Sequence, residues 1–484
     1  MAFTDRLANR GSISTAEETM YSLLIDGDNC DGVITQTGGD RKKHTISFWH
    51  KRAPRWDYAD GIQAQTGEGE ADWSSNDLWG TQSEGDTLRF DGSKLSFFQE
   101  GGTGSNLTTK RYFRDYAAWY HIVIAIDTSQ GTAANRVKMY INGVHMNGST
   151  FLGTANYPDQ NDEFKLMQNG ENFRIGAGHG GNTNINGQGY YANFIIVDGA
   201  QKAATDFGEW DEDTPTIWKH KEYTGDYNTG SGTNGALYEF EGTAEGTGST
   251  GTGQDTSGEG NHIDFRNHNG GVLDSPLNNF CVLQPTYMED INNTAPFMLT
   301  HGSTKLAVDS SVSSVSWGPH AGSFQLSKGK WYWEMKWDSG YTFLVGVANA
   351  SHQNSSSVYN YCTMYRPQNG NKYIDNTITS YGSSNSVGDV VGIALDLDNE
   401  TLQAYINNSS EGAAFGLGTK TKASGYYVPM IWYGDTGTST LNFGQSIHSS
   451  FSNAETDGDG YGSFQYSPPT GFMSLCTKNL AEYG

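Results

Sequence analysis

The amino-acid sequence predicts an all-β protein with two jelly-roll-like β-sandwich domains joined by a Gly/Thr-rich connector. Two features of the composition favour this fold class: 62 of the 484 residues are glycine, and 13% are aromatic. Glycine suits tight turns, whereas aromatic side chains favour the half-buried surface of a strand. The third observation is the spacing of the chain, in which short apolar runs alternate with Gly, Asn and Asp, as in a β-sandwich.

The strands expected in the first half of the chain are short and bounded by turn residues. Residues 120–127 are apolar on both faces of a strand and therefore predict a central strand that is covered on two sides. The next strand ends at Asn142-Gly143, a pair that supplies the positive φ angles of a tight hairpin turn. The full set predicted here comprises residues 44–51, 120–127, 136–141, 173–177 and 190–197.

The second half contains the clearest alternation of apolar and polar residues, at residues 330–337. One face of this strand carries large apolar side chains, namely Trp331, Trp333, Met335 and Trp337. The further strands predicted here comprise residues 343–348, 390–397, 402–406, 426–433 and 439–443. Helical periodicity is absent, apart from short helices expected near residues 4–10 and at the extreme C-terminus.

Composition shifts divide the chain into five segments. Residues 1–19 form a polar arm, residues 20–200 a first sandwich and residues 300–450 a second sandwich. Residues 201–299 form a connector, in which residues 242–260 are rich in Gly and Thr and predict a flexible linker. Residues 451–484 form a C-terminal tail.

The charge and the cysteines exclude several classes of protein. The formal net charge of −24 repels phosphate, which argues against nucleic acid as a partner. We expect no transmembrane helix, because no run of about 18 apolar residues occurs, and no secretory signal, because the N-terminus lacks an apolar stretch. The spacing of the four cysteines matches no metal or redox motif, so we expect free thiols in a reducing cytoplasm.

Two family resemblances accompany the two predicted sandwiches. Residues 119–143 (WYHIVIAIDTSQGTAANRVKMYING), with ISFW at 46–49 and FRIGAG at 173–178, resemble the laminin-G or concanavalin-like family over about residues 20–200. The second region resembles the SPRY family through four motifs in order, GKWYWE at 329–334, VGV at 345–347, GDVVGIALD at 388–396 and LNFG at 441–444.

A third resemblance spans the whole chain. The strings DFGE at 206–209, SGEGN at 257–261, DSPLNNF at 274–280, PPTGF at 468–472 and CTKNL at 476–480 resemble a virion protein of tailed bacteriophages that joins a laminin-G-like to a SPRY-like domain. This resemblance implies assembly in the host cytoplasm and a place on the tail or capsid surface of the virion. It also implies that residues 1–19 dock onto other virion proteins.

The resemblance implies a tail fibre or fibre-tip adhesin, present as a homotrimer, that binds a host-surface glycan or protein receptor and is not an enzyme. The alternative is a structural decoration or head-fibre protein of the capsid without receptor binding. A third hypothesis is a polysaccharide depolymerase, which requires two carboxylates at catalytic separation in a cleft.

Aromatic residues in expected loops are the candidate receptor-binding residues. Aromatic rings stack on the apolar faces of sugars and also dominate protein interfaces. One group follows the strand at 44–51, and the other lies in a loop region of the SPRY-like domain. The candidates are Trp56, Tyr58, Trp73, Trp79, Tyr359, Tyr361 and Tyr365. The competing interpretation is that these rings pack beneath long loops or at a subunit interface.

Carboxylates cluster at two places. Asp26, Asp28 and Asp31 lie in IDGDNCDG, where oxygen ligands in a Gly-rich loop suit Ca²⁺, although the pattern favours an ordinary acidic turn over a calcium site. Asp457 and Asp459 give a weaker second candidate for calcium. In EWDED, Glu209 and Asp211 imitate the paired carboxylates of glycosidases, but their position after the last strand of the first sandwich favours a solvated connector. No catalytic residue and no cofactor other than calcium is expected.

Overall fold

The structure is a computed structural model, and it describes residues 20–26, 30–54, 76–83, 85–99, 104–178, 187–242, 251–268, 270–284, 297–308, 318–340, 343–352, 358–434, 436–445 and 451–484. The chain divides into two compact units. Unit 1 comprises the described residues of Met1–Arg52, Thr66–Gly271 and Ser275–Leu277. Unit 2 comprises the described residues of Ala53–Gln65, Val272–Asp274 and Asn278–Gly484. The predicted arm at 1–19 lies outside the described residues.

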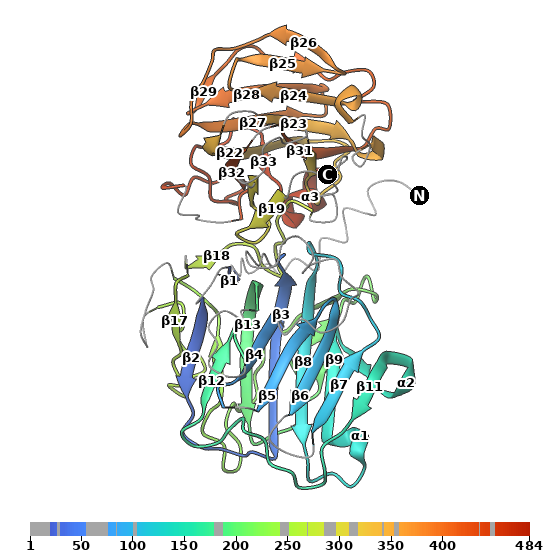
Figure 1. Ribbon diagram of the computed structural model, residues 1–484, viewed down its shortest axis with the longest axis vertical. Coiled ribbons are helices and arrows are strands. Elements are labelled where there is room, and N and C mark those ends of the chain that lie inside the picture. The colour runs from blue at the N-terminus through green and yellow to red at the C-terminus, as the bar shows by residue number, and fades with distance from the viewer. Residues whose placement is uncertain are drawn as a thin grey trace. The chain divides into compact units, whose positions relative to one another are not determined.

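Unit 1 is built from two large β-sheets and a small hairpin (Figure 1). The first sheet contains, in spatial order, β10 (Val144–Met146), β9 (Val137–Ile141), β8 (Trp119–Asp127), β3 (Lys43–Arg52), β13 (Gly189–Asp198), β1 (Ser22–Ile25) and β18 (Gly271–Val272), with β16 (Ala236–Tyr238) paired to β13. The second contains β11 (Leu152–Asn156), β7 (Ser105–Thr109), β6 (Lys94–Gln99), β5 (Asp86–Asp91), β4 (Asn76–Thr81), β12 (Asn172–Ile175), β2 (Asp31–Thr35) and β17 (Asp264–Arg266). The hairpin consists of β14 (Gly208–Trp210) and β15 (Trp218–His220).

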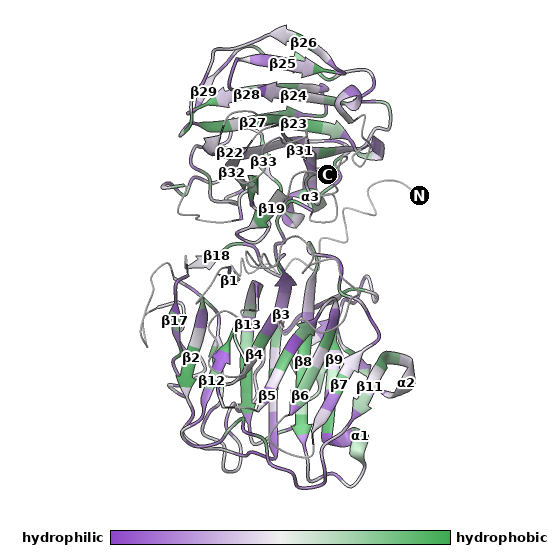
Figure 2. Ribbon diagram, in the orientation of Figure 1, coloured by the Kyte–Doolittle hydropathy of each residue, from purple (hydrophilic) through white to green (hydrophobic). Residues whose placement is uncertain are grey.

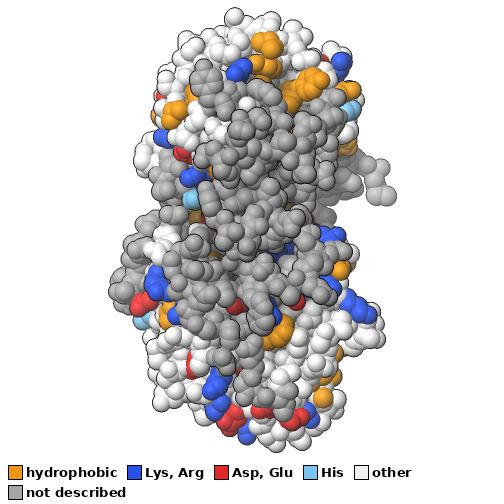
Figure 3. Space-filling view, viewed as in Figure 1, with side chains coloured by type: hydrophobic (Ala, Val, Ile, Leu, Met, Phe, Trp, Pro, Cys, Tyr) orange, Lys and Arg blue, Asp and Glu red, His pale blue; other side chains and the backbone are white. Residues whose placement is uncertain are grey.

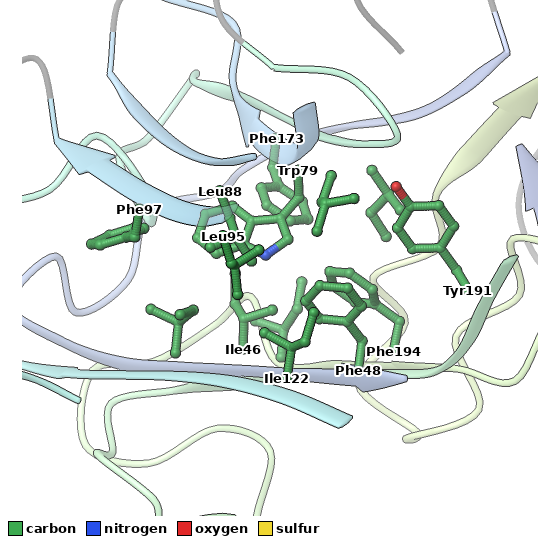
Figure 4. Packing of buried hydrophobic residues seen from close by; sticks show 14 of the residues in the cluster. Ile46, Phe48, Trp79, Leu88, Leu95, Phe97, Ile122, Phe173, Tyr191 and Phe194 are labelled. Atoms are coloured by element: carbon green, nitrogen blue, oxygen red, sulfur yellow. The ribbon is translucent and has the colours of Figure 1, made fainter. Parts of the chain in front are cut away.

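The predicted strand at 120–127 occupies the position expected for it. It forms β8 between β3 and β9, and Ile124 pairs with Ile46 on β3. The hairpin that follows turns at Asn142 and Gly143, whose φ angles are 46° and 75°. Large rings and aliphatic side chains of both sheets fill the space between them, as Figure 4 shows around Phe48, Trp79 and Phe194.

The first sheet of unit 1 is covered on its other face as well. Val123 and Ala125 of β8 pack there against Phe207 and Trp218, which belong to the segment after β13. Further along the chain, β16 joins the first sheet and β17 joins the second. The expected connector at 201–299 therefore differs from the structure, because its described residues up to Gly271 fold as part of unit 1.

The second half of the predicted Gly/Thr-rich linker also packs into unit 1. Residues 243–250 lie outside the described part, but Thr252 and Asp255 are buried, and Asp255 bridges to Tyr238 of β16. The Asp255 side chain accepts hydrogen bonds from the backbone N–H groups of Leu237, Ser257 and Asn261. Polar turn chemistry thus holds this stretch in place without an apolar run.

Unit 2 also consists of two β-sheets. The larger contains β19 (Phe297–Thr300), β20 (Lys305–Val308), β32 (Gly437–Asn442), β22 (Lys330–Gly340), β27 (Val390–Asp396), β28 (Thr401–Ile406) and β29 (Ser409–Ser410), with β30 (Phe415–Gly416) on β28 and β33 (Met473–Ser474) on β22. The smaller contains β21 (Gly318–Ala321), β31 (Tyr427–Tyr433), β23 (Phe343–Asn349), β24 (Cys362–Arg366), β25 (Asn371–Ile374) and β26 (Thr377–Ser380). Figure 2 shows hydrophobic residues on strands such as β23 and β27.

Strand β22 confirms the predicted alternation and explains its polar face. Its four large apolar side chains are buried in the core of unit 2. On the opposite face, the Phe464 ring packs on Tyr332, and the Glu334 carboxylate accepts the backbone N–H groups of Gln465 and Tyr466. The expected C-terminal tail at 451–484 is therefore a cover of this face, and β33 extends it by pairing with β22 in parallel.

The described helices are few and short. They comprise α1 (Ala133–Arg136), α2 (Gly148–Phe151), α3 (Thr477–Tyr483) and the 3₁₀ turns η5 (Ala204–Asp206), η7 (Ala350–His352) and η8 (Val358–Tyr361). Helix α3 confirms the helix expected at the C-terminus, whereas the one expected near 4–10 lies outside the described residues. Within the described residues, no helix has the length and apolar character needed to cross a bilayer. The four cysteines are buried free thiols. The fold class predicted from the sequence, all-β with sandwich domains, is confirmed.

Candidate functional site: an aromatic surface on unit 2

Three loops of unit 2 meet at one end of the strands β23, β24 and β31. They are η7 after β23, η8 before β24 and the turn at 418–426 before β31. The backbone N–H of Ala350 donates to the carbonyl of Tyr426 (2.9 Å), and the Asn349 amide donates to the carbonyl of Lys420 (3.0 Å). These loops present a set of side chains that we name the aromatic surface: His352, Tyr359, Tyr361, Lys420 and Tyr426.

Ring stacking orders the aromatic surface. The rings of His352 and Tyr361 stack with centroids 3.6 Å apart and an interplanar angle of 9°. The Lys420 ammonium lies 6.0 Å from the centroid of the Tyr361 ring. Tyr359 stacks on Trp432 of β31 at 5.8 Å, so its ring is held while 38% of the residue stays exposed. A rigid, half-exposed ring loses little entropy on binding, which favours a contact surface.

Asp375 positions the turn that carries Lys420 and Tyr426. This residue follows β25 and has a φ angle of 47°. Its carboxylate accepts the backbone N–H groups of Lys420 (2.7 Å) and Thr421 (2.9 Å), together with the Thr421 hydroxyl (2.8 Å). One carboxylate with three donors fixes the turn.

Sequence analysis does not predict three members of the aromatic surface, namely His352, Lys420 and Tyr426. The polar, Tyr-rich loop predicts Tyr359 and Tyr361 as binding residues, and the structure places both at this surface, Tyr359 exposed and Tyr361 half-buried. Tyr426 is 55% exposed, although its sequence position at the start of an apolar strand suggested a strand residue. His352 and Lys420 carried no local signal, because only the fold brings their loops to Tyr361.

Tyr365 requires a correction. It lies on β24, not in a loop, and its ring is 0% exposed in the core of unit 2. Its hydroxyl donates to the Glu411 carboxylate (3.0 Å) and accepts from the Asn385 amide (2.9 Å). A ring that is closed off from solvent in this way cannot stack on a ligand.

The aromatic candidates of unit 1 include one clear correction. Trp79 lies on β4 with its side chain completely buried against Phe97 and Phe173 (Figure 4). It is a core residue and not a receptor-binding residue. The other three candidates, Trp56, Tyr58 and Trp73, lie outside the described residues.

The predicted calcium site is also corrected at its central residue. Asp31 is completely buried, and its Oδ2 pairs with the Arg174 guanidinium (3.0 Å) while Oδ1 pairs with that of Arg266 (2.5 Å). Two cations therefore already neutralise the carboxylate that a calcium ion would need. Asp28 lies outside the described residues, and the described part of the chain, Asp26 included, contains no group of three metal-ligating side chains.

Asp457, of the weaker acidic pair, acts as a scaffold. Its Oδ1 accepts the backbone N–H groups of Asp459 and Tyr461, and its Oδ2 accepts the Ser474 hydroxyl and the Asn479 amide. These bonds tie the C-terminal cover to helix α3. The carboxylate is satisfied within the protein, so the acidic turn is structural.

The EWDED carboxylates belong to the β14–β15 hairpin. Lys219 lies 3.3 Å from Glu209 and 3.8 Å from Asp211. Asp211 also accepts the backbone N–H groups of Asp213 and Thr214, which closes the hairpin turn. These partners give both carboxylates a structural role, and the depolymerase hypothesis gains no support from them.

A serine and a histidine also meet in unit 1, beneath the same hairpin. His121 Nε2 lies 2.9 Å from the Ser47 hydroxyl, and the Trp218 indole donates to His121 Nδ1 (3.0 Å). Because Nδ1 accepts, the neutral ring carries its proton on Nε2 and donates to Ser47. Burial lowers the pKa of His121 to about 3, so this imidazole is not poised to activate a nucleophile.

Comparison with known proteins assigns the central part of unit 2 to a domain family. The two sheets of unit 2 are antiparallel apart from the β22–β33 pair, and the SPRY domain family matches residues 330–446. Residues 330–446 thus form a SPRY domain, which confirms the resemblance of this region. The aromatic surface lies on loops within this domain.

Among solved structures, the chain is similar to the SPRY domain of human HERC1, with 19% identity and a TM-score of 0.26 over 31% of this chain and 93% of that chain. It is also similar to a stonustoxin structure, with 19% identity and a TM-score of 0.27 over 34% of this chain and 27% of that chain. No curated protein matches the chain.

Proposed function

We propose that the chain is a non-enzymatic binding protein whose SPRY domain contacts its partner through the aromatic surface. The observation that carries this proposal is the pair of exposed rings, Tyr359 and Tyr426, beside the half-buried, stacked His352–Tyr361 pair. SPRY domains mediate protein–protein interactions, which favours a protein partner. Aromatic anchors of this kind dominate the energetics of such interfaces.

We further propose that this binding protein is displayed on a tailed-phage virion, as a tail fibre or fibre tip that binds a host-surface receptor. The support is the order of sequence motifs that resembles such virion proteins, together with the acidic net charge of −24 that suits an exposed, solvated protein. A homotrimer would present three aromatic surfaces, and this multivalency would compensate for weak single-site affinity.

Adsorption of the labelled full chain to a panel of candidate bacterial hosts tests the proposal. We expect saturable adsorption to at least one strain, with a loss of at least tenfold in affinity for Tyr361→Ala. Tyr112→Ala is the matched control, because Tyr112 is an exposed tyrosine of unit 1. Protease treatment of the cells distinguishes a protein receptor from a glycan, which glycan stripping removes.

Two results would overturn the proposal. One is saturable adsorption that Tyr361→Ala leaves unchanged, which would place the contact elsewhere. The other is a folded protein that adsorbs to no strain in the panel, which would favour the structural decoration protein of the capsid instead.

A further inference from the structure

A polar cavity lies on unit 1, independent of the SPRY domain. It has a volume of about 440 Å³ and is lined by Val33, Ile34, Thr35, Asn172, Arg174, His262, Asp264 and Arg266. Small-molecule sites fall in the range of roughly 300–1,000 Å³. The lining comes from β2, β12, β17 and the residue two before β17, so strand register places most of these groups. Figure 3 shows basic, acidic and histidine side chains side by side over β17, at the left of the view.

Packing beneath the cavity holds β17 in place. Phe265 points into the core, and its ring covers Gly32 of β2 so closely that a side chain at position 32 would overlap it. Alternation along the strand then turns Asp264 and Arg266 outward on the same face. Both outward side chains are exposed and lie outside the hydrophobic core.

The buried Asp31 carboxylate orients the two arginines. Arg266 donates hydrogen bonds from Nε (3.0 Å) and Nη2 (2.5 Å) to Asp31 Oδ1, so its Nη1 can donate to a ligand. The Arg174 side chain is only 9% exposed and uses Nη1 on the other oxygen of Asp31. Both guanidinium groups are thereby fixed in position before any ligand arrives.

The other polar groups alternate between donors and acceptors. His262 Nδ1 accepts the backbone N–H of Asp255 (3.0 Å), so the neutral ring presents an Nε2–H donor. The Asp264 carboxylate makes no hydrogen bond or ion pair with the described residues, and so it remains an acceptor. Thr35 donates to the side-chain oxygen of Asn172 (2.6 Å), which leaves the lone pairs of its hydroxyl free.

We propose that this cavity binds a neutral polyhydroxylated ligand, namely a sugar residue of a glycan. Each hydroxyl of a sugar can both donate and accept a hydrogen bond. Neighbouring hydroxyls can therefore donate to the Asp264 carboxylate and accept from His262 Nε2–H and Arg266 Nη1. The positive charges of Arg174 and Arg266 are balanced by the negative charges of Asp31 and Asp264. The cavity therefore offers no excess charge to an ionised ligand. An acidic sugar would also face the net charge of −24 of the whole chain.

Saturation-transfer NMR with the full chain tests this proposal. The probes are the neutral sugars D-glucose, D-galactose, D-mannose and N-acetylglucosamine, and the acidic sugars glucuronic acid and N-acetylneuraminic acid. We expect saturation transfer to at least one neutral sugar and at least a fivefold weaker signal in Asp264→Asn. His262→Asn should act in the same way, because Asn can keep the contact with Asp255 while it removes the Nε2–H donor.

Asp213→Asn provides the matched control, since Asp213 is an exposed carboxylate of the same unit outside the cavity. It should leave the signal unchanged, and equal melting temperatures of all variants establish that they fold. The proposal is overturned if no neutral sugar gives a signal, if only the acidic sugars do, or if Asp264→Asn binds the neutral sugar as well as the wild type. A result from this test is independent of whether unit 2 adsorbs to cells.

Discussion

In unit 1, Trp79 lies on strand β4 and is completely buried, whereas in unit 2 Tyr359 lies on the 3₁₀ turn η8 and is 38% exposed. Both residues occur in polar sequence stretches that resemble loops. The difference is that Trp79 and its polar neighbours Asn76, Asp77 and Thr81 are all buried in strand β4, whereas Tyr359 lies on a short turn outside the strands. An aromatic residue in a polar sequence is therefore a core residue where its polar neighbours belong to a buried strand.

In both units, a segment without a long apolar run covers the outer face of a β-sheet. In unit 1, the segment after β13 covers the outer face of the first sheet with Phe207 and Trp218. In unit 2, the C-terminal segment covers the outer face of β22 with Phe464. Both segments are rich in Gly, Asp and Thr and were expected to be a connector and a tail. In the C-terminal cover, the Phe464 ring acts together with the hydrogen bonds of Glu334 to Gln465 and Tyr466 and with the β33–β22 pairing.

The comparison is sharpened most by paired alanine variants in the two units. Trp79→Ala opens a cavity in the core of unit 1 and should cost about 3–5 kcal/mol of unfolding free energy. Tyr359→Ala should cost less than about 1 kcal/mol, because much of its ring is already exposed. Chemical denaturation of both variants measures the difference. Similar losses in the two variants would contradict the contrast between strand and loop aromatics.

A second pair compares a buried and an exposed ion pair in unit 1. Asp31→Asn leaves the buried Arg174 without its partner and should destabilise unit 1 by about 3–5 kcal/mol. Glu163→Gln removes the exposed pair with Arg41 and should cost less than about 1 kcal/mol. Both variants are measured by thermal unfolding. If Asp31→Asn melts like the wild type, the arginines do not depend on Asp31.

Acid should weaken unit 1 more steeply than unit 2. Burial lowers the pKa of His50 and His121 to about 3 and that of His220 to about 4 in unit 1, and raises the pKa of Asp86 to about 7. In unit 2, burial lowers the pKa of His320 to about 3 and of His301 to about 4, and raises that of Glu334 to about 7.

The sign follows from proton uptake. A histidine with a lowered folded pKa costs stability as the pH falls below about 6.5, because only the unfolded chain takes up its proton. A carboxyl with a raised folded pKa acts oppositely and gains stability as the pH falls through 7. For the groups with these values, the net difference between pH 6 and 5 is two protons in unit 1 and one in unit 2, or about 2.8 against about 1.4 kcal/mol per pH unit. Burial also lowers the pKa of His44 and His145 in unit 1 and raises the pKa of Asp338 in unit 2, which widens the difference. Calorimetry at the two pH values tests this, and His121→Gln should lower the slope for unit 1 by about 1.4 kcal/mol per pH unit.

The smallest effect concerns the turn that supports the aromatic surface. Asp375→Ala removes three hydrogen bonds to Lys420 and Thr421, and we expect a loss of about 1–3 kcal/mol. Adsorption to host cells should fall severalfold, since Lys420 and Tyr426 lose their fixed positions. Asp375→Asn keeps one acceptor oxygen, so its stability and adsorption should lie between those of the wild type and Asp375→Ala. If Asp375→Ala adsorbs as well as the wild type, the turn that Asp375 holds does not contribute to binding.

Much of the fold could be predicted from local pattern, because β8 is long and apolar on both faces and β22 is long and strongly alternating. Strands β4 and β24 could not, because each is short and mixes polar residues with its rings, and so Trp79 and Tyr365 were assigned to loops. The sites are harder still. Asp31 meets Arg174 and Arg266 across 143 and 235 residues, a contact that no local spacing encodes.

Hydroxyl-radical footprinting of the full chain on receptor-bearing cells is the most direct test of the account. The exposed tyrosines of unit 2 and the exposed Tyr112 of unit 1 should oxidise readily in the free protein. On cells, we predict that Tyr359, Tyr361 and Tyr426 are oxidised at least threefold more slowly while Tyr112 is unchanged. Unchanged oxidation of the three tyrosines on cells that retain the protein would contradict the assignment of the aromatic surface as the binding surface.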